Sequence, residues 1–200
     1  MARRIATGSR LLPMPNRSPR RTFILVDGEN IDATLGGTIL GRKPEPGERP
    51  RWERVIDFAR RLWGQDATGL FFLNASNGYL PGPFVSALLN IGFRPVPLAG
   101  ESNEKVVDIG IQRTLDALVD RDADVLLCSH DVDFLDQVSR LLDADQRVGL
   151  IGFPELVSGA YATLDLPVYD LESDVKAFTS PLPRVRIIPL AEFDPMVFLR

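Results

Sequence analysis

The sequence of 200 residues contains only one cysteine, Cys128, and only one histidine, His130. A single cysteine cannot form an internal disulfide, and one cysteine with one histidine is too small a set for a zinc site. Any metal ion that binds here must therefore have oxygen ligands. The sequence also lacks an apolar run of the roughly 18 residues that cross a bilayer, and it lacks the apolar segment of a secretory signal. We expect a soluble, cytoplasmic protein with no membrane partner.

Two common catalytic motifs are missing as well. Ser129, His130 and Asp131 are adjacent in the sequence, so they cannot adopt the hydrogen-bonded line of a hydrolase triad. The segment 41–50 (GRKPEPGERP) lacks the spaced glycines and the GK[ST] ending of a phosphate-binding loop. We interpret Cys128 as a core residue at the end of a strand, and His130 as a loop residue rather than a metal ligand.

Positive charge is scarce outside the N-terminal arm. Residues 1–21 contain six arginines and no acid, which leaves 17 basic and 27 acidic residues in the rest of the chain. Such an acidic body binds a polyanion only where a basic groove or a divalent cation offsets its charge. We expect the arm 1–21 to be a disordered tail or to precede a true start at Met14, although its composition also resembles an organellar transit peptide.

Apolar, β-branched and aromatic runs predict strands, and apolar residues at helical spacing predict helices. The predicted strands are 22–26, 69–74, 93–98, 124–128, 147–153 and 167–171. The predicted helices are 52–64, 84–92, 103–120 (with Ser102 or Asn103 as its N-cap) and 133–145. The Gly- and Pro-rich segment 36–50 predicts a long surface loop, and the two prolines in 93–98 predict an edge strand.

Strands that are apolar throughout, alternating with helices, are typical of a parallel sheet covered on both faces. We therefore predict a doubly wound, three-layer α/β/α domain that is Rossmann-like, with a mostly parallel central sheet. The domain is expected to span 22–172. Residues 173–200 are expected to form a C-terminal extension, and its apolar side chains are candidates for docking on the domain.

Ligands of an open parallel sheet bind at the carboxyl ends of its strands, where loops and helix N-termini converge. The polar residues that we expect at this edge are Asp27 and Asn30 after the first strand, Asp131 and Asp133 after the strand 124–128, and Asp108 near the start of the helix 103–120. Crowded carboxylates repel one another unless a cation lies between them. Magnesium prefers oxygen ligands, and such a site suits phosphodiester hydrolysis. We predict Mg²⁺ or Mn²⁺ at this edge.

Each of these acids also has a structural interpretation. Asp133 is placed to cap a helix that begins near Phe134, and Asp108 can stabilise the dipole of its own helix. Lys105, three residues before Asp108, is either a solvated neighbour or a ligand of the scissile phosphate. The convergence of four acids from three segments on one edge favours a functional site.

Three sequence blocks resemble the NYN domain family, the LabA-like branch of the PIN-like nuclease superfamily. FILVDGENI resembles its opening strand and Asp-x-x-Asn motif, and EKVVDIGIQRTLDAL resembles its Lys-x-x-Asp helix. DVLLCSHDVDFLDQVSRLLDADQRVGLIGF resembles its closing Ser-Gly-Asp-Ser-Asp-Phe block. The motif positions are Asp27 and Asn30, Lys105 and Asp108, and Ser129, Asp131, Asp133 and Phe134. By motif order the resemblance covers residues 22–172.

The resemblance implies a PIN-like α/β/α fold and RNA as the substrate. It implies further that Asp27, Asp108, Asp131 and Asp133 are catalytic residues that bind Mg²⁺ or Mn²⁺, with Asn30, Lys105 and Ser129 binding substrate. Three positions depart from the family pattern: His130 replaces a glycine, Val132 replaces a small polar residue, and Thr114 replaces an acid. The nearby acid Asp116 lies about 80° further round the helix from Asp108.

Three functions therefore stay open. The first is a metal-dependent ribonuclease, and the second is a non-catalytic RNA- or protein-binding regulatory module on the same fold. The third is a phosphatase or receiver-like domain, which would use Asp27 as its nucleophile. Such phosphatases usually carry a second aspartate two residues later, where this sequence has Glu29. A homodimer is a further open prediction.

Overall fold

The computed structural model describes residues 20–101, 103–184, 188 and 190–199. Apart from its last two residues, the basic arm predicted for 1–21 lies outside the described residues. Of these two, Arg20 forms ion pairs with Asp122 and Asp124, and Arg21 begins the first strand. Within the described residues, no helix is both long enough and apolar enough to cross a membrane.

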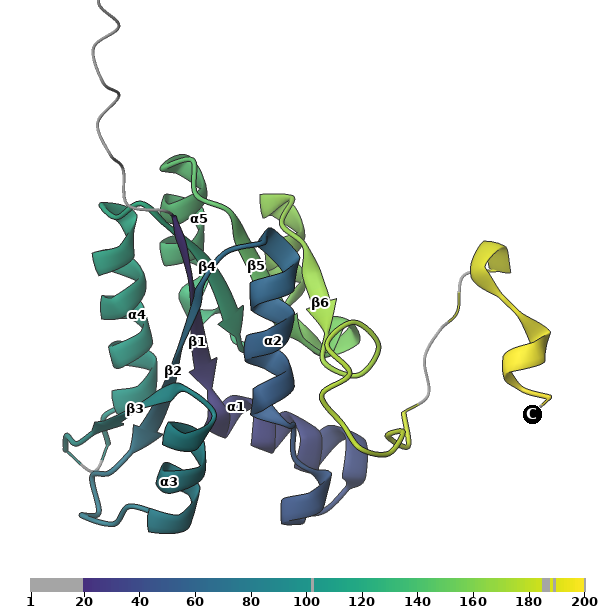
Figure 1. Cartoon of the computed structure of the whole chain (residues 1–200), viewed down its shortest axis with the longest axis horizontal. Coiled ribbons are helices and arrows are strands. Elements are labelled where there is room, and N and C mark those ends of the chain that lie inside the picture. The colour runs from purple at the N-terminus through teal and green to yellow at the C-terminus, as the bar shows by residue number, and fades with distance from the viewer. Residues whose placement is uncertain (1–19, 102, 185–187, 189, 200) are drawn as a thin grey trace, which may run out of the picture.

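The centre of the protein is a six-stranded sheet in which every neighbouring pair is parallel (Figure 1). Its order is β3-β2-β1-β4-β5-β6, so β3 is an edge strand, as its two prolines predict. The strands are β1 (Arg21–Asp27), β2 (Ala67–Asn74), β3 (Phe93–Leu98), β4 (Ala123–Cys128), β5 (Val148–Gly152) and β6 (Val168–Asp170). This confirms the predicted α/β class and the predicted parallel sheet.

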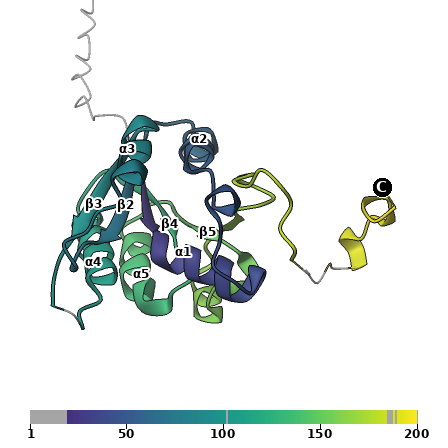
Figure 2. The same ribbon diagram turned by 90° about the horizontal axis from the view of Figure 1, so that it is seen from below.

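Helices cover both faces of the sheet, which gives three layers (Figure 2). The helices are α1 (Gly28–Thr34), α2 (Trp52–Trp63), α3 (Gly82–Asn90), α4 (Val106–Val119) and α5 (Leu135–Asp143). On β1, Ile24 and Val26 pack with α1, α2 and α3, whereas Leu25 packs with α4 and α5. Successive side chains of a strand point to opposite faces, so one apolar strand supplies two cores.

The structure corrects the prediction of a surface loop over 36–50. The chain stays helical beyond β1, first as α1 and then as a π-helical segment, Leu35–Leu40. Ile31 and Leu35 are fully buried on this helical segment, so the apolar face outweighs the helix-breaking tendency of the two glycines that follow. Only the part after Leu40 is a loop, and it contains a single 3₁₀ turn.

The start of α4 also differs from the prediction. The helix begins at Val106 rather than at 103, and its N-cap is Lys105, which makes no side-chain capping bond. Asn103 lies in a turn before the helix, and Ser102 lies outside the described residues. The later start places Asp108 in the first turn of α4, at the edge of the sheet.

The segment that follows β6 packs against the domain. Val175 and Ala177 are buried in the same core as α2. The guanidinium group of Arg54 on α2 donates to the carbonyl oxygens of Lys176 and Phe178 at 2.7 and 2.8 Å. The apolar residues at the far C-terminus, including Leu190 and Phe198, are instead exposed.

The pairing of β2 with β3 predicts a sensitive position at Gly69. It pairs with Phe93, and a Cβ at Gly69 would overlap the Phe93 ring. Gly69→Ala should lower the free energy of unfolding by about 1 to 3 kcal/mol through overpacking, measured by urea unfolding. Gly37→Ala is the matched control, because Gly37 is helical with no atom near its absent Cβ and alanine favours helix. Equal stability of the two variants would contradict this packing.

Candidate active site

The strand order reverses between β1 and β4, which are hydrogen-bonded neighbours at the centre of the sheet. After β1 the chain enters α1 on one face, and after β4 it enters α5 on the other (Figure 2). Such a reversal opens a crevice at the carboxyl ends of the two strands, because their connections leave in opposite directions. The motif residues after β1 and β4 lie at this point.

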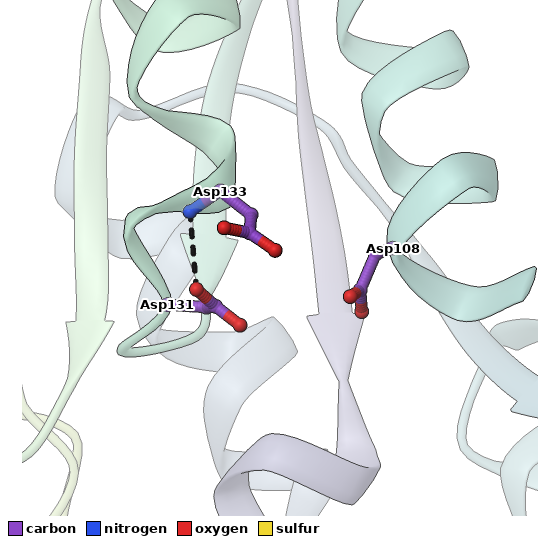
Figure 3. Close-up of side chains that lie close together, drawn as sticks. All are labelled: Asp108, Asp131 and Asp133. Carbon is purple, nitrogen blue, oxygen red and sulfur yellow. Dashed lines mark hydrogen bonds between the residues drawn. The ribbon is translucent and has the colours of Figure 1, made fainter. Parts of the chain in front are cut away.

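Three of the four predicted acids form a compact cluster. One carboxylate oxygen from each of Asp108, Asp131 and Asp133 lies within 4.8 Å of the other two. Figure 3 shows the side chains pointing into the same space, one from α4 and two from the turn after β4. The oxygen Oδ1 of Asp131 accepts a hydrogen bond from the backbone N–H of Asp133 at 3.0 Å. Asp131 therefore caps the 3₁₀ turn Val132–Phe134, the role that the structural interpretation had given to Asp133.

Lys105 supplies positive charge to the cluster. Its Nζ lies 2.9 Å from Oδ2 of Asp133 and 3.3 Å from Oδ2 of Asp108. These two carboxylates raise the pKa of Lys105, first through hydrogen bonds and then through their charge. The side chain is 68% exposed, so the pairs are screened by water and the lysine can move. The lysine thus bridges two acids. The sequence alone had suggested either a solvated neighbour of Asp108 or a ligand of the phosphate.

Asp27 lies beside the cluster but outside the set of three. Its residue is only 3% exposed at the end of β1. Its Oδ1 accepts from the backbone N–H of Asn30, and its Oδ2 accepts from the hydroxyl of Ser129, both at 3.1 Å. The pKa of Asp27 is raised to about 6. Burial is the main cause and the charges of Asp108 and Glu29 add to it, whereas the two hydrogen bonds lower the pKa.

Ser129 and Asn30 use their side chains to join the two central strands. The Ser129 hydroxyl donates to Asp27 and accepts from the backbone N–H of Asp131 at 3.2 Å. The oxygen Oδ1 of Asn30 accepts from the backbone N–H of His130 at 2.9 Å. These hydrogen bonds hold the loop after β4 against the end of β1, and so fix the position of the Asp131 backbone.

The cysteine and the histidine are both buried. Cys128 is fully buried in the core, and burial raises the pKa of its thiol, which confirms its interpretation as a core residue. Burial, with the nearby charge of Arg184, lowers the pKa of His130 to about 4. Both ring nitrogens of His130 have protein partners, so neither is free to ligate a metal. The histidine's part in holding Asn30 is a feature that sequence reasoning missed.

Thr114, where the resemblance implies an acid, lies on α4. Its hydroxyl donates to the carbonyl oxygen of Gly110 within the same helix at 2.7 Å. The neighbouring acid, Asp116, pairs with Arg140 of α5 at 2.6 Å. Neither side chain contributes to the cluster, which therefore has three carboxylates, with Asp27 beside them.

A cavity is lined by residues of α1, α2, α3 and β2. Its volume is about 870 Å³, and its lining begins at Gly28 and Glu29, directly after Asp27. Most of the lining is apolar, and it includes the aromatic side chains of Trp52, Phe71 and Phe84. None of the three cluster acids is part of this lining.

The residues of the cluster fit a divalent cation. All three are carboxylates, the hard oxygen ligands that Mg²⁺ and Mn²⁺ prefer, and their oxygens are close enough to share one ion. Within the described part of the chain, Lys105 is the one basic residue paired with any of these acids. A single mobile ammonium group leaves negative charge unbalanced, and a divalent cation would offset it.

The buried carboxyl of Asp27 makes stability depend on pH in metal-free protein. Its usual pKa is 3.8 and its folded value is about 6, so stability present below about pH 4 is lost as the pH rises to about 6. Asp27→Asn keeps an acceptor for the Asn30 N–H and removes this loss. In urea unfolding with EDTA, it should be about 2 to 3 kcal/mol more stable than wild type at neutral pH and nearly equal at about pH 4. Parallel pH profiles for the two proteins would contradict the raised pKa.

Comparison with known proteins agrees with this geometry. No curated protein sequence matches the chain. A crystal structure of a protein of unknown function from Vibrio parahaemolyticus has a similar fold, with a TM-score of 0.62. The match has 20% sequence identity and covers 80% of this chain and 98% of that one. The NYN domain family matches residues 21–164, which contain the whole cluster. The chain therefore belongs to the NYN domain family, within the PIN-like nuclease superfamily.

Proposed function

We propose that this protein is a divalent-metal-dependent ribonuclease. The observation that carries the proposal is the set of three carboxylates within 4.8 Å at the switch point of a domain from a nuclease superfamily. In this proposal Asp108, Asp131 and Asp133 hold Mg²⁺ or Mn²⁺. Asp27 stays a predicted fourth ligand, because its carboxylate interacts electrostatically with that of Asp108. Both of its oxygens already accept hydrogen bonds.

A divalent cation held by these carboxylates would activate a water molecule and offset charge on the phosphodiester. The protein's own groups then position the substrate. Lys105 is exposed, and its Nζ would donate to a phosphate oxygen beside the cluster. The amide nitrogen of Asn30 is a second donor. Ser129, predicted to bind substrate, acts in the structure by fixing Asp27.

RNA is proposed as the substrate because the chain belongs to a family that acts on nucleic acid. Because the body of the protein is acidic, it would repel RNA in the absence of a cation. In this proposal the cation therefore helps to bind the RNA as well as to cleave it. The cavity beside Gly28 has a mostly apolar lining with aromatic side chains, and we propose that it takes a nucleobase of the RNA. A cytoplasmic location and a homodimer stay predictions.

A non-catalytic RNA-binding module is the second candidate. It is favoured by the side chains at the position of the additional acid, because Thr114 bonds to its own helix and Asp116 pairs with Arg140. A phosphatase with Asp27 as the nucleophile fits less well. That carboxylate is almost fully buried and its oxygens accept two hydrogen bonds, so it is poorly placed for attack.

The ribonuclease proposal predicts cleavage of a labelled single-stranded RNA with millimolar Mn²⁺ and none with EDTA. Asp131→Asn and Asp108→Asn should each lower the cleavage rate by at least about 100-fold, because each replaces an anionic ligand by a neutral amide. Both should also weaken Mn²⁺ binding in calorimetry. The rates come from gel analysis of fragments over time.

Asp116→Asn is the matched control, because it removes an acid from the same helix whose partner is Arg140 rather than the cluster. Its cleavage rate and Mn²⁺ affinity should equal those of wild type. Equal cleavage by Asp131→Asn would refute the role of that carboxylate. Tight RNA binding with no cleavage in any metal would favour the non-catalytic module.

A further inference from the structure

His130 is held between the ends of three elements: β4, α1 and β5. Its backbone N–H donates to Oδ1 of Asn30 at 2.9 Å. A backbone N–H can only donate, so the Asn30 atom at this contact must be the amide oxygen. The orientation of the Asn30 carboxamide is therefore fixed by the hydrogen-bond pattern.

The same reasoning fixes the proton on the histidine ring. The backbone N–H of Phe153 donates to Nε2 of His130 at 2.8 Å, so Nε2 must be an acceptor without a hydrogen. The ring is then neutral, and its hydrogen lies on Nδ1. That nitrogen lies 2.9 Å from Oδ1 of Asn30, so the Asn30 oxygen accepts a second hydrogen bond.

The end of β5 has room for this ring. A Cβ on Gly152 would lie 2.7 Å from Nε2 of His130, so any larger residue there would displace the ring. The ring also stacks on Phe153, with centroids 5.5 Å apart and planes 5° apart. The ring is thus held by packing as well as by hydrogen bonds.

We propose that His130 is a positioning residue that orients Asn30 for binding an anionic ligand. Two donors from His130 hold the amide oxygen, and within the described residues no protein group accepts from the amide nitrogen. The nitrogen is therefore the free end of the carboxamide, and it presents a donor beside the carboxylate cluster. This proposal rests on the proposed function, in which the ligand is an RNA phosphate.

Two substitutions separate the two bonds of the ring. His130→Asn places an amide nitrogen near the position of Nδ1, so it keeps the donor to Asn30 and loses the acceptor for Phe153. His130→Gln places an amide oxygen near the position of Nε2, so it keeps that acceptor and loses the donor. His130→Asn should retain kcat/KM within about threefold, whereas His130→Gln should lose about tenfold, mostly through KM. Equal losses in the two variants would overturn the proposal.

The ring hydrogen can be observed directly, because His130 is the only histidine of the chain. Long-range ¹H–¹⁵N spectra of the full-length protein at neutral pH should show one neutral ring, protonated at Nδ1 and bare at Nε2. A ring protonated at Nε2 would contradict the geometry. This readout needs neither metal nor RNA, so it does not depend on activity.

The dependence on Asn30 is tested by a double-mutant cycle. His130→Gln should cost about tenfold in wild type and have almost no effect in the Asn30→Ala background. Full additivity would show that the histidine acts elsewhere and would overturn the proposal. If wild type binds RNA without cleaving it, the same cycle is measured on the Kd of RNA, so failure of the ribonuclease proposal is distinguishable from failure of this one.

Discussion

The pairing of β1 with β4 is the contact on which the site depends. These strands are the central pair of the sheet, and their carboxyl ends deliver Asp27 and Ser129 side by side. Because the strand order reverses at this pair, α1 and α5 leave on opposite faces and do not close the space above them. The packing of α4 against the sheet then brings Asp108 toward the acids that follow β4. Acids from three segments therefore meet in one place as a result of strand order. Their carboxylates repel one another, which is unfavourable for the folded state.

Asp124 differs from the acids of the cluster in the basic residues that pair with it. Asp124, near the start of β4, is fully buried, but Nε and Nη2 of Arg147 both donate to its Oδ2, and Arg20 pairs with it as well. The charge of a buried carboxylate with such partners is balanced within the protein, so it needs no added cation. At the other end of the sheet, the exposed Lys105 is the one basic residue among the described residues that pairs with the cluster. Unbalanced charge at one end and balanced charge at the other support a cation site at the carboxyl edge.

Much of this arrangement could be predicted from the sequence, because uniformly apolar strands and the order of three motifs specify a parallel sheet and its functional edge. The helical course of Ile31 to Leu40 was missed because Gly36 and Gly37 are typical of loops, and only tertiary burial of Ile31 and Leu35 shows otherwise. The role of His130 depends on Asn30 and Phe153, which are 100 and 23 residues away in the chain. No local pattern encodes contacts of that kind.

Anomalous diffraction from a crystal soaked in Mn²⁺ tests the central claim most directly, because it places the ion without reference to substrate or rate. The account predicts an anomalous peak bounded by the carboxylates of Asp108, Asp131 and Asp133, with the ammonium group of Lys105 moved away from between Asp108 and Asp133. A well-ordered crystal with no peak there, and with Lys105 still bridging those two acids in excess Mn²⁺, would contradict it.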